Sequence, residues 1–102
     1  MASYVAHYTK KQQILGRKEL ALRRLIDRGA APEKLMSAAA DVRDARIRAL
    51  RARRATIVPK NDAYVQYAKI DDKIQALLNT PLLSILADFG LEWQNADTQS
   101  SD

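Results

Sequence analysis

The residues that break helices constrain this chain more than any other feature. Only three glycines and three prolines occur in 102 residues, and most of them lie at intervals that suit helices of ordinary length. Five of the six separate helix-length segments: Gly29, Pro32, Pro59, Pro81 and Gly90. The sixth, Gly16, falls inside the first helical pattern, where glycine costs about 1 kcal/mol relative to alanine. This spacing predicts a few helices joined by tight turns.

The amino-acid composition indicates the same fold class. The chain contains 17 alanines and 12 leucines, and both residue types lose little side-chain entropy in a helix. We predict an all-α fold, with a single helical domain over residues 1–93 and a disordered polar tail over residues 94–102. The sequence has neither an apolar run of membrane-spanning length nor the apolar stretch of a signal peptide, so we expect a cytoplasmic protein.

The first half of the chain predicts an antiparallel helical hairpin over residues 4–57. Before Arg28, one helical stripe carries larger apolar side chains, which is typical of one buried helix face: Tyr8, Leu15, Leu22, Leu25 and Ile26. Gly29 suits the left-handed position after a last helical turn, and Pro32 suits the first turn of the next helix, residues 32–57. Because the connection is only a few residues long, the two helices must run antiparallel.

Two starting points for the first helix remain open. The helical pattern extends back to Tyr4, but Thr9 and Gln12 have the spacing of a capping box, which favours a start at Lys10. A start at Lys10 makes the first helix much shorter than the second. A start at Tyr4 makes the two arms of the hairpin similar in length.

The second helix carries two apolar stripes on different sides. One stripe has small side chains: Ala38, Val42, Ala45, Ala49 and Ala52. The other is bulkier: Met36, Ile47, Leu50 and Ile57. Small side chains let another helix backbone come close, whereas bulky ones form an ordinary core face. We therefore expect this helix to pack against two neighbours.

A third helix over residues 62–79 and a short apolar helix over residues 81–89 complete the predicted fold. In the third helix apolar side chains repeat at spacings of three and four. Thr80 and Pro81 have the order of an N-cap followed by a first-turn proline, and Gly90 suits the end of the short helix.

The C-terminal helices hold more apolar surface than a two-helix hairpin can cover. Residues 77–91 include eight Leu, Ile and Phe residues in fifteen. We therefore expect two copies to form a dimeric bundle. Five residues are the predicted subunit contacts: Ile74, Leu78, Leu82, Leu86 and Phe89. The alternative is that the short helix folds across the hairpin of its own chain as a lid.

The two parts of the chain carry opposite charge. Residues 1–60 hold 15 Lys and Arg against 5 Asp and Glu, whereas residues 61–102 hold 2 against 7. Six arginines lie within twelve residues of the second helix: Arg43, Arg46, Arg48, Arg51, Arg53 and Arg54. They form a solvated face or pair with carboxylates of their own chain, dock an acidic protein, or contact the phosphates of a nucleic acid.

Conventional catalytic and metal-binding motifs are missing from the sequence. His7 is the only histidine and has no carboxylate within one helical turn, while Asp71 and Asp72 diverge by about 100° as helix neighbours. We therefore predict a non-catalytic oligomerisation and protein-interaction module that uses no cofactor. The first alternative is a basic nucleic-acid-binding protein that contacts phosphates through the six arginines. The second is an Arg-lined small-anion enzyme, which requires a pocket with three convergent basic groups.

Overall fold

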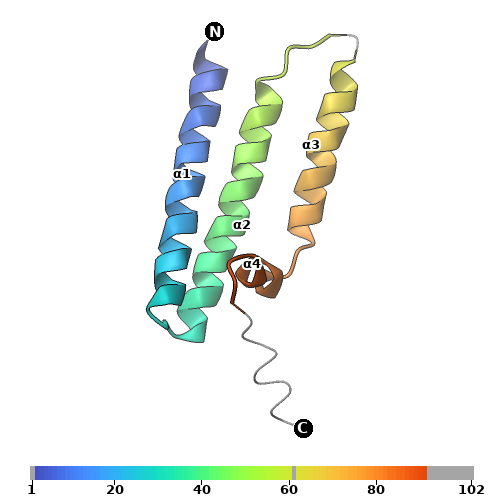
Figure 1. Ribbon diagram of the computed structural model, residues 1–102. Helices are drawn as coiled ribbons and strands as arrows, with labels where there is room; N and C mark the ends of the chain where they lie inside the picture. The colour runs from blue at the N-terminus through green and yellow to red at the C-terminus, as the bar shows by residue number, and fades with distance from the viewer. Residues whose placement is uncertain (1, 61, 92–102) are drawn as a thin grey trace.

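The computed structural model describes residues 2–60 and 62–91, and this part of the chain is helical with no strand. The four helices are α1 (Ala2–Asp27), α2 (Pro32–Ala55), α3 (Ala63–Leu78) and α4 (Leu82–Asp88). Figure 1 shows α2 between α1 and α3, with α4 at the end of the hairpin where α1 turns into α2. The predicted all-α fold, hairpin, third helix and short helix are confirmed. The predicted tail over residues 94–102 lies outside the described residues.

The first helix takes the earlier of its two possible starts. Because α1 begins at Ala2, the arms of the hairpin are 26 and 24 residues long. The predicted capping box is wrong, because Thr9 and Gln12 both lie inside α1. The Gln12 side-chain amide instead donates a hydrogen bond of 2.7 Å to the hydroxyl of Tyr8, one turn earlier.

Two glycines end helices in the left-handed conformation. Gly29 has a φ of 69° and Gly90 a φ of 88°, values that cost a side-chain-bearing residue strain. After Gly29, the amide of Ala30 donates to the Leu25 carbonyl at 3.0 Å, and after Gly90 the amide of Leu91 donates to the Leu86 carbonyl at 3.1 Å. These bonds close the last turns of α1 and α4 and confirm the predicted glycine positions.

The predicted cap at Thr80 is wrong. Its hydroxyl donates to the Ala76 carbonyl at 2.6 Å, so the side chain ends α3 instead of starting α4. Residue Pro81 stands at the N-cap of α4, where no side chain caps the helix.

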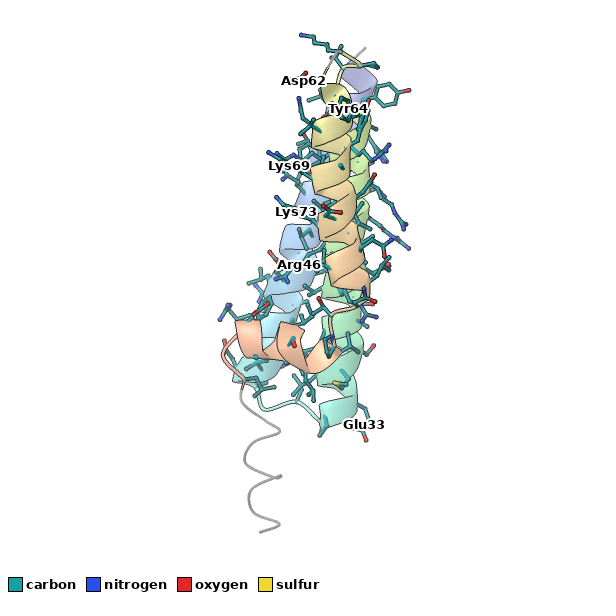
Figure 2. All side chains as sticks on the ribbon, turned by 90° about the vertical axis from the view of Figure 1, so that its right-hand side faces the viewer. Glu33, Arg46, Asp62, Tyr64, Lys69 and Lys73 are labelled. Atoms are coloured by element: carbon teal, nitrogen blue, oxygen red, sulfur yellow. The ribbon has the colours of Figure 1, made fainter. Side chains whose placement is uncertain are left out.

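The main hydrophobic cluster lies at the turn end of the hairpin, where α1, α2 and α4 meet. Figure 2 shows α4 running crosswise to the long helices. Its buried members are Leu22, Leu35, Ala39, Val42, Ile85 and Leu86. We call this group the base cluster. It makes α4 a lid on the hairpin of its own chain.

A smaller cluster joins α2 to α3. Ile47 of α2 packs with Ile70 and Ile74 of α3, and Leu50 and Ile57 lie against them. We call this group the α2–α3 cluster. The bulky stripe of α2 therefore faces α3, except that Met36 joins the base cluster.

The small stripe of α2 faces α1. Val42 is buried beside Leu22 in the base cluster, and further along Ala45 shares a shallow hollow with Ile14 of α1. We expected two neighbours for α2, and the structure gives it three: α1 and α3 lie along different sides of it, and α4 also packs against it.

Candidate functional site

The five predicted interface residues lie in different surroundings. Ile74 and Leu86 are buried by helices of their own chain, at 7% and 1% exposure, and Leu82 and Phe89 are half-buried against the base cluster. Only Leu78 is exposed, at 48%. Packing within one chain therefore covers four of the five residues at which we predicted a dimer contact. The fifth, Leu78, remains open to a partner.

Arg46 is held by carboxylates from two other helices. Its guanidinium lies 3.4 Å from the Glu19 carboxylate of α1 and 3.8 Å from the Asp88 carboxylate of α4. It also lies 6.0 Å from the centre of the Phe89 ring, which Arg23 approaches from α1 at 5.1 Å. Arg46 therefore links α4 to the hairpin.

Arg54 makes the closest ion pair that joins α2 to α3. Its Nε and one terminal nitrogen donate to the two oxygens of Asp71 at 2.9 and 3.3 Å, a bidentate pair. The guanidinium stacks 4.4 Å from the centre of the Tyr67 ring. The Tyr67 hydroxyl donates in turn to the Ile57 carbonyl at 3.3 Å, so this side of the α2–α3 contact is electrically matched.

Two further arginines of the predicted set also have partners within the chain. Arg43 donates to the Thr80 carbonyl at 3.0 Å, and Arg48 pairs with Asp44 at 3.2 Å one turn away on α2. Among the described residues, Arg51 and Arg53 enter no ion pair. The interpretation in which the arginines pair with their own chain therefore holds for three of the six, Arg46, Arg48 and Arg54, while Arg43 is held by a backbone carbonyl.

A basic cavity lies on one side of the contact between α2 and α3. Its volume is about 800 Å³, and its walls come from the end of α2, the segment of residues 56–60, and α3. The charged side chains that line it are Arg53, Lys60, Lys69, Lys73 and Asp72. We call it the cationic cavity. In Figure 2, Lys69 and Lys73 point to the same side of α3, whereas Tyr64 points to the other.

Sequence reasoning found only one of these four cations. Arg53 belonged to the predicted arginine set, but Lys69 and Lys73 lie in the acidic half of the chain, where they do not stand out by composition. Their spacing of four residues places them on one helix face. That signal identifies a lysine pair, although it does not show that the pair faces Arg53 and Lys60.

The described residues contain no group of three or more His, Cys, Asp or Glu side chains that could hold a metal ion. Each described helix is too short or too polar to cross a membrane. The chain matches no protein-family model, no curated protein and no solved structure. Its function must therefore be argued from the cationic cavity and from the exposed apolar side chains.

Proposed function

We propose that this protein is a non-catalytic helical interaction module that pairs with a second copy of itself. The observation that carries the proposal is an apolar pair left uncovered at the junction of α3 and α4. Leu78 is 48% exposed at the end of α3, and Leu83 is 39% exposed in the first turn of α4. The two leucines flank the turn of residues 79–81, which joins α3 to α4.

The proposed contact is narrower than the five residues predicted from the sequence. Ile74 and Leu86 serve the fold of the single chain, and Leu82 and Phe89 are half-buried. Leu78 stays in the proposed contact, and Leu83 joins it.

A second copy is the occupant we favour, because a two-fold axis brings the same patch of both subunits together. Each exposed leucine then meets apolar surface without a new complementary partner.

Sedimentation equilibrium at micromolar concentration tests this proposal. We expect a particle of about twice the 11.5 kDa chain mass, and a melting temperature that rises with protein concentration. Replacing both leucines, Leu78→Ser with Leu83→Ser, should raise the dimer dissociation constant by roughly tenfold or more, because apolar burial is lost at the contact.

The matched control is Leu20→Ser, which removes a leucine of 49% exposure from α1. This change should leave the dissociation constant unaltered. A wild-type chain that sediments at 11.5 kDa at every concentration, with a constant melting temperature, contradicts the proposal. Leu86→Asp cannot serve as the test, because Leu86 belongs to the base cluster and its loss disrupts a monomer as well.

The other interpretations of the sequence stay predictions. Docking of an acidic protein and the cytoplasmic location have no observation of their own. For nucleic-acid binding through the arginine segment, two of the six arginines form no ion pair among the described residues: Arg51 and Arg53. The Arg-lined small-anion enzyme needs three convergent basic groups; the cationic cavity has four, of which only Arg53 is an arginine.

A further inference from the structure

We propose that the cationic cavity binds a small polyphosphate anion. The cavity has a volume of about 800 Å³, which lies in the range of about 300–1,000 Å³ typical of small-molecule sites. Four basic side chains from three separate segments surround it: Arg53, Lys60, Lys69 and Lys73. With Asp72 as the one carboxylate, the lining carries a net charge of +3.

These cations lack the partners that other basic residues of the chain have. Among the described residues, Arg46, Arg48 and Arg54 are each paired with a carboxylate, whereas none of the four cavity cations enters an ion pair. Like charges that converge on one hollow repel each other, and an anion placed among them relieves that repulsion. The cavity is therefore better matched to an anion than to water alone.

The other carboxylate of this part of α3 faces away from the cavity. Asp71 lies two residues from both Lys69 and Lys73, so on a helix it points about 160° away from each of them. It is occupied by Arg54 in a bidentate pair at 2.9 and 3.3 Å. The α2–α3 contact thus has one matched side and one side with excess positive charge.

The shape and lining favour a compact anion over a nucleic-acid strand. The cations line one hollow, while a strand is bound by charges that follow its length. No aromatic side chain lines the cavity, so it offers no ring on which a base could stack. The amide of Gln66 adds an uncharged donor to the lining.

More than one phosphate group is needed to match the cavity. A single phosphate reaches only the cations within contact distance of its own oxygens, whereas the four cations line a hollow of about 800 Å³ between three separate segments. An anion with linked phosphates can contact several of them together.

Calorimetric titration of the whole chain with sodium tripolyphosphate, at low salt, tests the proposal. We expect saturable binding of one tripolyphosphate per chain that weakens as salt rises. Removing two of the cations, Lys69→Ala with Lys73→Ala, should raise the dissociation constant roughly tenfold, because each exposed charge contact contributes a factor of a few. Both side chains are exposed, so circular dichroism should show an unchanged fold.

A matched control separates the cavity from the overall charge of the protein. Lys34→Ala with Arg51→Ala removes the same two positive charges from exposed positions of α2 that do not line the cavity. The control pair should change the dissociation constant by less than about twofold. An equal loss of affinity in both double variants overturns the proposal, because the binding would then depend on net charge alone.

The cavity carboxylate provides a test with the opposite sign. Asp72→Asn removes the only negative charge of the lining, so it should tighten tripolyphosphate binding about threefold. Unchanged or weaker binding by this variant contradicts the proposed site.

Two other probes define the ligand class. Orthophosphate should bind at least tenfold more weakly than tripolyphosphate, since it makes fewer of the charge contacts at once. The dissociation constant of a single-stranded oligonucleotide, expressed per phosphate group, should be no lower than that of tripolyphosphate expressed in the same way. If the oligonucleotide binds more tightly and its binding depends on Lys69 and Lys73, the site is a nucleic-acid site and the polyphosphate proposal is wrong.

Discussion

The two ends of α2 serve different purposes. At the turn end, α1, α2 and α4 meet around Leu22 and Leu86, which are fully or almost fully buried. At the far end, α2 meets α3 through the smaller α2–α3 cluster, and the surface beside it is the cationic cavity. The comparison shows that one helix can carry the main core of the chain at one end and an exposed charged surface at the other.

The difference follows from which elements reach each end. The crosswise helix α4 covers only the turn end, so that end has a third wall (Figure 1). The far end has no such cover, and its side chains between α2 and α3 must tolerate water. Basic residues do so because their stems lie along apolar surface while their charged groups stay hydrated.

The largest expected effect is a loss of stability caused by a substitution in the base cluster, at the turn end. Leu86→Ala should lower the free energy of unfolding by about 2–5 kcal/mol, since a fully buried leucine leaves a cavity that the neighbours only partly fill. Ile74→Ala in the smaller α2–α3 cluster should cost less, because that cluster has fewer buried members with which to pack. Urea denaturation followed by circular dichroism measures both values. Equal losses would show that the two ends contribute alike to stability.

An intermediate effect raises stability without touching either end. Gly16 lies within α1, and apart from its own stretch of helix a methyl group added there would meet no atom within 4 Å. Gly16→Ala should therefore raise the free energy of unfolding by about 0.5–1 kcal/mol, because glycine is a poor helix former. Gly29→Ala is the contrasting control and should destabilise the protein, since Gly29 has a φ of 69°. Thermal melts report both signs, and a loss of stability in Gly16→Ala would contradict the helical position of this residue.

The smallest expected effect concerns the matched side of the far end. Asp71→Asn breaks the bidentate pair with Arg54. The Asp71 side chain is 49% exposed and the Arg54 side chain 43%. Such an exposed pair contributes about 0.2–1 kcal/mol, and the contribution should shrink as salt is added. Hydrogen exchange of α3 amides should become faster, while exchange at the base cluster stays the same. Faster exchange at both ends would mean that the chain opens as one unit.

Local signals in the sequence predicted the helices and the turns well. Gly29, Pro32 and Gly90 act through their own backbone preferences, so their effect on the chain does not depend on distant contacts. The two stripes of α2 predicted its contacts with α1 and α3, because side-chain size and helical spacing are local properties, but they did not predict its third contact, with α4. The local signals at Thr9 and Thr80 were misleading. At Thr9 the helix continued to an earlier start, and at Thr80 the hydroxyl bonded backward to α3.

The sequence by itself determined the all-α class, the order of the helices and the antiparallel hairpin, because short connections and breaker residues act over a few positions. Only the tertiary structure decided that α4 closes its own hairpin, which buries Leu86 and leaves Leu78 exposed. It also decided that Lys69 and Lys73 share a cavity with Arg53 and Lys60. Both outcomes depend on how α3 and α4 pack against α2, and side chains far apart in sequence come together only when helices pack.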